Sequence, residues 1–557
     1  MVYGEVRILS WVQNNNKIMT MANTTLKVRN RIATKTTKEW ETENPILLKG
    51  EMGYDSTSNK AKVGDGVTKW TELDFFMASD LKDIINILNN HNIAISDLKN
   101  TSVLNVAEDG FYVTDNDGYV IFKVDEKGFE IPMSSLDEDS YSYGVEIDTK
   151  SSSPTLKRIG NPQLHKSLPI QSKMIGCLLD DNGNVTNYLS DNDWVDDSSF
   201  IDGTEGQVMV EIPKFYYKFE TDGDIQRVRI SEYPLSGYKL SNTMYIGAYE
   251  ASLQRSTLKL CSVCNYDADY RGGNNQSAWD DTYRSLLGRP VTVISRINFR
   301  KYARNRNTAM TNWNILTYQA YKMIYWLYTI EYASLNSQLA YNAELTSEGY
   351  HQGGFNAGVT NWNDTSWNNY NGYNPFVPCG WTNSLGNGTG IVPYEVKDAD
   401  GNVLLITNVP RYRGIENPFG HIWKFIDGIN IRISPTEENG GDGLSKVYVC
   451  KNTSLFSDTN YDGYDYVGDE ARKDGYVKKL IFGDDGEIMP LEVGGGTTSY
   501  FCDYHYTSIP TSAESLSAVL FGGSASSGSY AGFSCAYSIL APSYAFAYFG
   551  SRLCFIK

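Results

Sequence analysis

Short strand-like runs separated by long loops constrain the fold of this chain more than any other feature. From about residue 143 to the end, such runs alternate with loops rich in Asn, Gly and Trp. The expected strands are 207–212, 215–219, 403–406, 429–433 and 446–450. One stretch, 318–334, has the pattern of a buried helix, and Thr317 can cap it. The mixture predicts an α+β fold whose long loops carry the binding functions.

Length and charge narrow the classes of protein that remain. A chain of 557 residues is long enough for several domains of about 150 residues each. Its formal net charge of −17 supplies no basic field for phosphates, so nucleic-acid binding is not expected. The chain has 40 tyrosines against 21 phenylalanines, and tyrosine is enriched where surfaces bind other molecules. The eight scattered cysteines predict buried, reduced thiols rather than a disulfide scaffold.

The sequence predicts neither export nor membrane insertion. Residues 1–20 are expected to be a leader or flexible start, and the apolar runs at the N-terminus are too short for a secretory signal. The most apolar stretch, 318–335, is interrupted by Lys322 and Glu331 and falls short of a membrane span.

Residues 21–78 are predicted to form a small β module. Glycines punctuate its short strands, and 64–66 supplies the positive φ angles of a tight turn. The run from Trp40 through Lys-Gly-Glu and Val-Gly-Asp-Gly to Trp70 resembles the small N-terminal domain of phage tail fibres and tropism determinants. This resemblance implies attachment to phage tail or baseplate proteins.

Residues 79–150 are predicted to form a trimeric stalk made of a short coiled coil and a β shaft. Apolar residues of 81–98 fall on a and d positions, although an ordinary amphipathic helix fits the same pattern. Between 105 and 130, a turn followed by an aromatic residue recurs, with alternating strands between the turns. Such strands have too little apolar surface to fold alone, so copies in a homotrimer would supply partners. The alternative is a β meander within one domain.

No motif in the sequence predicts an enzyme. The chain lacks the zinc-protease, serine-hydrolase and phosphate-loop motifs, and its five histidines have no spacing that makes a site. One acidic loop places oxygen donors at positions 1, 3, 5 and 12, as in a calcium loop. The predicted calcium ligands are Asp458, Asn460, Asp462 and Asp469. The alternative is that these residues only form turns, and no other cofactor is expected.

The end of the chain carries a second resemblance. Gly522-Gly523-Ser524, the closing run 549–555 and the Asn-Pro-Phe-Gly step at 417–420 resemble signatures of the C-type-lectin fold. Formylglycine-generating enzymes and the variable proteins of diversity-generating retroelements share that fold, so 151–557 is expected to be a C-type-lectin-like head. The enzymes hold copper through two cysteines soon after the Gly-Gly-Ser step, and 525–532 contains none. The resemblance therefore implies a binding protein.

Residues 524–549 are predicted to be a variable stretch that binds a ligand. Ser, Tyr and Phe residues there follow no period, and they supply contact area and adaptable hydrogen bonds. The predicted contact residues are Ser526, Ser527, Tyr530, Ser534, Tyr537, Ser538, Leu540, Ser543, Tyr544, Phe546 and Tyr548. The alternative is that this Ser-rich, apolar end is a buried strand region.

Together these features predict a multidomain phage tail-fibre protein of the virion that attaches to a bacterial surface receptor, either a glycan or a protein. A homotrimer is expected. Two other classes stay open, a tail-associated polysaccharide depolymerase and a purely structural fibre. Paired carboxylates about 5 to 10 Å apart in a groove would favour the depolymerase.

Overall fold

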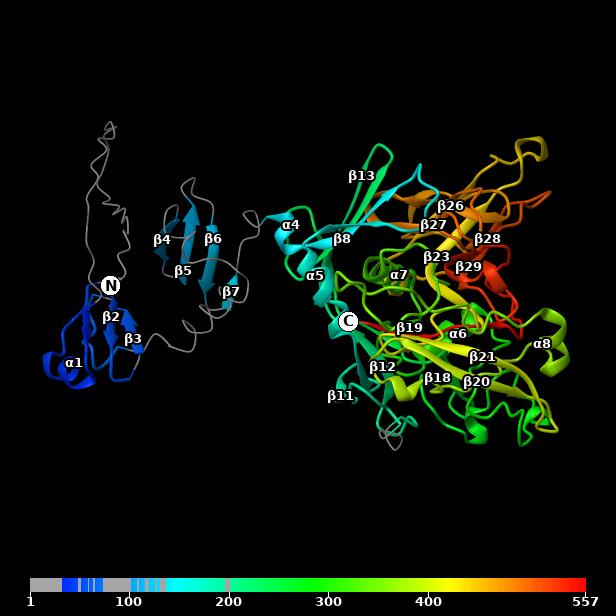
Figure 1. Ribbon diagram of the computed structural model, residues 1–557, viewed down its shortest axis with the longest axis horizontal. Coiled ribbons are helices and arrows are strands. Elements are labelled where there is room, and N and C mark those ends of the chain that lie inside the picture. Colours follow the sequence, from blue (N-terminus) through cyan, green and yellow to red (C-terminus); the bar gives the residue numbers. More distant parts are fainter. Residues whose placement is uncertain are drawn as a thin grey trace. The chain divides into compact units, whose positions relative to one another are not determined.

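The computed structural model divides the chain into two units, Met1–Leu136 and Asp137–Lys557 (Figure 1). The described residues are 33–48, 52–58, 60–63, 66–73, 102–107, 110–115, 120–125, 128–130, 137–195 and 201–557. The predicted leader and the predicted coiled coil at 81–98 lie outside the described residues. The expected domain boundary lies at 151, whereas the second unit begins at 137, because β8 (Tyr143–Asp148) pairs with β14 (Ile225–Ser231) of that unit.

The N-terminal module combines three strands with one helix. β1 (Ala33–Lys35) runs parallel to β2 (Met52–Asp55), which pairs antiparallel with β3 (Lys60–Val63). The helix α1 (Thr37–Glu43) is not expected from the glycine pattern, which suggests strands alone. Its sequence signal is the capping box that Thr36 and Glu39 form at its start.

The core of this module contains a pair of tryptophans. The rings of Trp40 and Trp70 stack with 4.0 Å between their centroids. A Cβ on Gly53 would lie 2.5 Å from the Trp70 ring, so glycine lets β2 pass close to the pair. The two ends of the sequence motif therefore meet in the fold. The predicted tight turn at 64–66 is described only at Gly66, whose φ is 84°. Residues 64 and 65 lie outside the described residues.

Residues 102–130 form a four-stranded antiparallel sheet in chain order. Its strands are β4 (Ser102–Ala107), β5 (Gly110–Asp115), β6 (Val120–Asp125) and β7 (Gly128–Glu130). Each strand pairs with the next one along the chain. The predicted strands are confirmed, and their order is that of the meander that the sequence left open.

Two sheets of the second unit contain its first strands and its last strand. A five-stranded sheet has the order β15-β13-β14-β8-β9, and a six-stranded sheet has the order β11-β10-β12-β16-β32-β19. The remaining strands are β9 (Lys157–Gly160), β10 (Ile175–Leu179), β11 (Val185–Tyr188), β12 (Gln207–Ile212), β13 (Phe215–Asp222), β15 (Lys239–Ser241), β16 (Met244–Gly247), β19 (Trp313–Ile315) and β32 (Leu553–Ile556). The last strand of the chain, β32, is therefore an inner strand between β16 and β19.

The largest sheet carries most of the C-terminal stretch. It has the order β25-β24-β23-β29-β30-β28-β26-β27, and β31 pairs with β23. Its strands are β23 (Trp423–Ile433), β24 (Ser445–Val449), β25 (Asp465–Asp469), β26 (Gly475–Phe482), β27 (Glu487–Val493), β28 (Tyr504–Tyr506), β29 (Ser515–Gly522), β30 (Gly532–Tyr537) and β31 (Phe549–Gly550). Smaller sheets contain β17 (Ser252–Gln254) and β18 (Lys259–Cys261), and β20 (Gly390–Lys397), β21 (Val403–Tyr412) and β22 (Ile415–Glu416).

The helix α7 (Tyr318–Tyr332) lies at the centre of the larger core (Figure 1). The predicted helix and its cap are confirmed, since Thr317 Oγ1 accepts a hydrogen bond from Ala320 N at 3.2 Å. Every residue of α7 except Gln319 is buried. Because α7 packs against both β8 and β23, it joins the five-stranded sheet to the largest sheet. The other helices of this unit are α4 (Glu138–Tyr141), α5 (Pro162–Ser167), α6 (Arg296–Arg304) and α8 (Asp364–Asn371).

Strands dominate the described residues, so the fold is mostly β with few helices where an α+β fold was expected. The five strands predicted from short apolar runs are confirmed in β12, β13, β21, β23 and β24. All eight cysteines are free, and seven of them are buried, as expected. Within the described ranges, no helix has both the length and the apolar character needed to cross a membrane.

Candidate functional site

The predicted contact residues fall into three groups by exposure. Ser543, Tyr530 and Tyr544 are exposed, the two tyrosines by 39% and 47%. The partly buried members are Ser526, Ser527, Tyr537, Leu540, Phe546 and Tyr548. Ser534 and Ser538 are fully buried, so the prediction that these two serines contact a ligand is wrong.

Three alternate side chains near the C-terminus form a ladder of stacked rings. The ring centroids of Tyr544 and Phe546 lie 6.0 Å apart, and those of Phe546 and Tyr548 lie 5.4 Å apart. Both pairs are within 14° of parallel. Neighbouring segments hold the main chain here, since Val293 N donates to Phe546 O at 3.0 Å and Trp423 N donates to Tyr548 O at 2.9 Å. Main-chain hydrogen bonds therefore fix the backbone at two of the three ring-bearing residues, Phe546 and Tyr548.

A second group of tyrosines surrounds Tyr530, which precedes β30. Its ring centroid lies 4.4 Å from that of Tyr504, 5.4 Å from that of Tyr476 and 6.3 Å from that of Tyr506. These three tyrosines lie on β26 and β28, which follow β30 in the sheet order. They are not among the predicted contact residues, although the alternation around His505 places Tyr504 and Tyr506 on one face of a strand.

Further rings join the two groups. The centroid of the buried Trp423 ring lies 6.0 Å from that of Tyr506 and 5.4 Å from that of Tyr537. Tyr537 lies 6.0 Å from the buried Phe549, which lies 5.1 Å from Phe546 of the ladder. We call the exposed and partly buried members of this continuous set the aromatic face: Tyr476, Tyr504, Tyr506, Tyr530, Tyr537, Tyr544, Phe546 and Tyr548.

Three phenols of the aromatic face, those of Tyr476, Tyr504 and Tyr537, are neutral hydrogen-bonding groups. Burial raises the pKa of Tyr537 to about 12 and also raises the pKa values of Tyr476 and Tyr504. Each of these O–H groups therefore keeps its proton at neutral pH and can both donate and accept. Tyr476 already uses its hydroxyl, whose oxygen lies 3.0 Å from Ser529 Oγ. The face thus offers apolar ring area with polar tips, which suits a broad and adaptable contact.

The frame around the face is closely packed. A Cβ on Gly550 would lie 2.3 Å from Ile422 Cδ1, so this position in β31 accepts no larger side chain without a shift. Arg552 donates to the main-chain oxygens of Gly247 at 2.8 Å and of Asn417 at 3.0 Å. Arg552 therefore anchors the closing strand β32 to these two segments. Glycine and arginine positions therefore fix the backbone from which the rings project.

The two buried serines bind carboxyl groups instead of a ligand. Ser534 Oγ donates to Asp503 Oδ2 at 2.8 Å. Ser538 Oγ donates to Glu470 Oε1 at 2.9 Å. Both serines therefore support the face from within the fold.

The predicted calcium ligands do not come together. The carboxylate of Asp458 is 6% exposed and is paired with Arg296 at 2.7 Å and with Arg300. Asn460 Oδ1 accepts a hydrogen bond from Asp462 N at 3.2 Å, which forms a local turn. Among the described residues, no group of three or more His, Cys, Asp or Glu side chains could hold a metal ion. The structure therefore gives no support to a calcium site at Asp458, Asn460, Asp462 and Asp469, and the turn-forming alternative fits.

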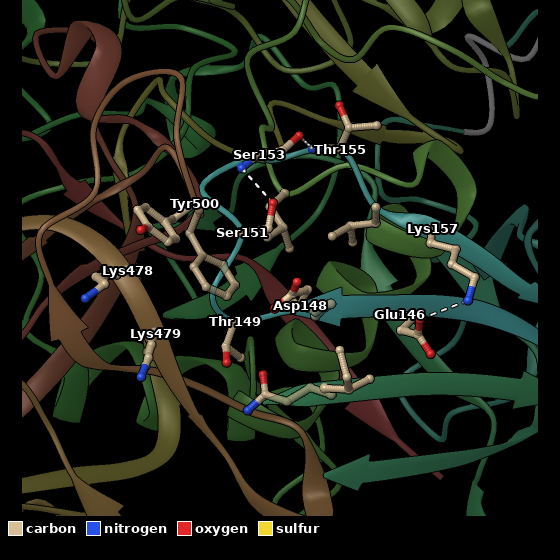
Figure 2. Close-up of a pocket in the computed structure, with 16 residues that line it drawn as sticks. Glu146, Asp148, Thr149, Ser151, Ser153, Thr155, Lys157, Lys478, Lys479 and Tyr500 are labelled. Atoms are coloured by element: carbon tan, nitrogen blue, oxygen red, sulfur yellow. Dashed lines mark hydrogen bonds and ion pairs between the residues drawn. The ribbon is translucent and has the colours of Figure 1, made fainter. Parts of the chain in front are cut away.

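A cavity of about 270 Å³ lies beside the loop 149–156 of the second unit (Figure 2). Among the charged side chains that line it, Glu146 pairs with Lys157 at 3.0 Å and Lys478 pairs with Glu492 at 2.7 Å. Hydroxyls of the serine-rich loop accept hydrogen bonds from the loop's own backbone. None of the predicted contact residues lines this cavity, so the aromatic face is the candidate site.

One comparison with known protein families concerns the N-terminal module. Residues 34–68 match the family model of the major tropism determinant N-terminal domain. No curated protein sequence matches the chain. Among solved structures, the chain is similar to "Major Tropism Determinant P3c Variant", with 11% identity, 94% of this chain and 99% of that chain covered and a TM-score of 0.20. It is also similar to "Major Tropism Determinant U1 Variant", with 10% identity, the same coverage and a TM-score of 0.21.

A third similar structure is that of PvdO from Pseudomonas aeruginosa, with 11% identity and a TM-score of 0.26. This match covers 64% of the present chain and 97% of the PvdO chain. The resemblance that the sequence shows between Trp40 and Trp70 is confirmed by the family model. Over residues 34–68 the chain is therefore similar to the N-terminal domain of the major tropism determinant.

Proposed function

We propose that this chain is a receptor-binding protein of a phage tail fibre. Its N-terminal domain would attach it to tail or baseplate proteins, and its second unit would contact the surface of a bacterial host. The tropism determinant N-terminal domain supports the first half of this proposal. The observation that carries the second half is the aromatic face, a continuous set of rings on a fixed backbone.

The exposed rings are the parts of the face that fit receptor contact best. Tyr530 belongs to one group of the face and Tyr544 to the other, and both keep more than a third of their surface exposed. Tyrosine gives a large contact area at low conformational cost, and its hydroxyl can pair with a sugar or a peptide. The proposed receptor is accordingly a bacterial glycan or protein.

We also propose that the second unit is a C-type-lectin-like head whose variable positions are the accessible part of 524–549. Ser534 and Ser538 are excluded from the proposed variable positions, because both side chains are buried. Positions such as Ser527, Ser543 and Tyr544 can change side chain at little cost to the core, because they are exposed or only partly buried. Diversification there would alter the contact surface and leave the frame intact.

Substituting the two exposed tyrosines tests the proposed function. Tyr530→Ala and Tyr544→Ala are each expected to weaken binding of labelled protein to the host strain about 30-fold, as for the loss of about 2 kcal/mol at an aromatic anchor. The melting temperature should stay unchanged, since both side chains are exposed.

The matched control is Tyr466→Ala, which removes a tyrosine that is 52% exposed and lies outside the aromatic face. Binding should survive this substitution. If all three variants bind as the unchanged chain does, the face has no role in attachment, and the purely structural fibre becomes the better interpretation.

We propose in addition that the chain forms a homotrimer. The sheet of β4 to β7 is small, and its outer strands β4 and β7 each pair on only one side within the described sheet. Neighbouring copies could extend or cover such edges. Light scattering on the full chain should give about three chain masses. A monomer at micromolar concentration would contradict the trimer and leave the meander as a domain of a single chain.

A further inference from the structure

Two buried carboxyl groups hold the strands that bear the aromatic face. β28 carries Tyr504 and Tyr506 and pairs in parallel with β30, which ends at Tyr537. Asp503 lies directly before β28, and Glu470 binds the residue directly after it. Each carboxyl also binds a serine in or just after β30. The two groups therefore connect β28 to the β30 segment at both ends of the strand pair.

The Asp503 carboxyl is enclosed and has no cationic partner. Its Oδ2 accepts hydrogen bonds from Ser534 N and Ser534 Oγ, both at 2.8 Å. A Cβ at Gly532 would lie 2.0 Å from its Oδ1, so only glycine at the start of β30 leaves room for this carboxyl. Oδ1 itself is buried without a hydrogen-bond partner, and Asp503 forms no ion pair within the described residues.

Glu470 is held in the same way on the other side of β28. Its Oε1 accepts hydrogen bonds from Ser538 Oγ at 2.9 Å and from Thr507 Oγ1 at 3.1 Å. His505 Nε2 lies 3.9 Å from Oε2 but is 3.0 Å from Ala471 O, to which it donates. Burial lowers the pKa of His505 to about 4, so this imidazole is neutral at pH 7 and provides no counter-charge.

Among the described residues, the other titratable groups near these carboxyls form no ion pair with them. Phenols and thiols face Asp503, namely those of Tyr321, Tyr325 and Tyr328 on α7, Tyr476 on β26, Cys502, and Cys535 on β30. Burial raises the pKa of each, so all are uncharged at pH 7. The cation that acts on Glu470 is Arg472, whose guanidinium donates to Ser434 O and Ser445 Oγ. Asp474 adds a negative charge near β28.

We propose that Asp503 and Glu470 are positioning residues that hold β28 against β30 in their protonated forms, so that the aromatic face is fully assembled only while both carry a proton. A protonated carboxyl can be enclosed at modest cost, whereas an ionised one without a cation would draw in water and separate the strands. The functional meaning of this device rests on the proposed function, but its effect on the fold does not.

The expected pH dependence follows from linkage. Burial raises the pKa of Glu470 and of Asp503 to about 8 each, well above the values near 4 expected in the unfolded chain. Between these values the folded protein binds protons that the unfolded chain has released, so stability falls as the pH rises. The contribution of these two carboxyls to the free energy of unfolding is complete below about pH 4 and is lost as the pH rises through about 8.

Melting temperatures measured from about pH 6 to about pH 9.5 test the proposal on the full chain. The unchanged chain should lose about 5 °C or more across this range. Asp503→Asn combined with Glu470→Gln keeps the shape and the neutral state, so this double variant should lose far less. The matched control Glu438→Gln, an exposed carboxyl, should follow the unchanged chain. Hydrogen exchange of 504–507 and 532–537 should rise at alkaline pH beyond the intrinsic rate in the unchanged chain only.

Parallel melting curves for the unchanged chain and the double variant would overturn the proposal, because another titrating group would then be responsible. If the double variant fails to fold, Ser534→Ala supplies the second test. This change removes a donor that favours the ionised form of Asp503, so the loss of stability should move to higher pH. These measurements use no receptor, so their failure is distinct from a failure of Tyr530→Ala and Tyr544→Ala to weaken binding.

Discussion

Replacing Asp458 with alanine is expected to lower the free energy of unfolding of the second unit by about 3 to 5 kcal/mol. The Asp458 carboxylate is nearly inaccessible and pairs with Arg296 at 2.7 Å and with Arg300. Both guanidiniums lie on α6, and that of Arg296 is fully buried. Removing the carboxylate would leave Arg300 with Asp427 and would take from Arg296 the carboxylate with which it pairs. Urea unfolding of the second unit would measure the loss.

The matched control is Asp462→Ala in the same loop, where the side chain is exposed. This change should alter stability by no more than about 0.5 kcal/mol. A chelator should leave the melting temperature unchanged, because Asp458 is occupied by arginines. A melting temperature that falls with chelator and recovers with calcium would contradict this arrangement and restore the calcium loop.

The acidic loop shows why spacing alone could not decide between these alternatives. A pattern of Asp and Asn at alternate positions before Gly463 is common to calcium loops and to simple turns. The difference lies in Arg296 and Arg300, which are distant in sequence and reach the loop only after α6 packs against β23. Burial alone would raise the pKa of the Asp427 carboxyl. The adjacent Arg300 guanidinium outweighs that effect, so the pKa of Asp427 lies below its usual value. Such a network depends on tertiary packing and leaves no local pattern.

Elements set by local chemistry were predicted more completely. The helix α7 is recognisable because Thr317 caps a long apolar stretch, and short apolar runs locate strands such as β12. The glycine spacing of this module favours strands alone, and only the Thr36 and Glu39 capping box marks the helix α1. The boundary at 137 was missed because β8 joins a sheet formed by strands much later in the chain.

The candidate site was predicted in part for the same reason. Tyr530 and Tyr544 were found because the C-terminal stretch is locally rich in aromatic residues. Tyr476 and Tyr504 were missed because β26 and β28 reach Tyr530 only through the order of strands in the sheet. Ser534 was assigned to the surface because a serine in a Ser-rich stretch resembles a contact residue until its carboxyl partner is known.

Replacing Arg552 with methionine is the second large effect that we expect. Arg552 is 1% exposed and donates to main-chain oxygens of Gly247, Asn417 and Glu416. Methionine fills a similar length but donates no hydrogen bond, so these oxygens would lose their donors inside the fold. The free energy of unfolding should fall by about 3 to 5 kcal/mol. Denaturant unfolding of the full chain would measure it.

The neighbouring charges decide how this result is to be interpreted. Arg552 also acts on the buried carboxylate of Glu250, which Lys424 contacts at 2.9 Å. Arg552→Lys keeps the positive charge but cannot supply the same fork of donors, so it should recover only part of the stability. Arg227→Met, in a more exposed ion pair with Glu146, should cost at most about 1 kcal/mol. If Arg552→Lys were as stable as the unchanged chain, the charge near Glu250 would be the stabilising feature, and the bonds to the main chain would not.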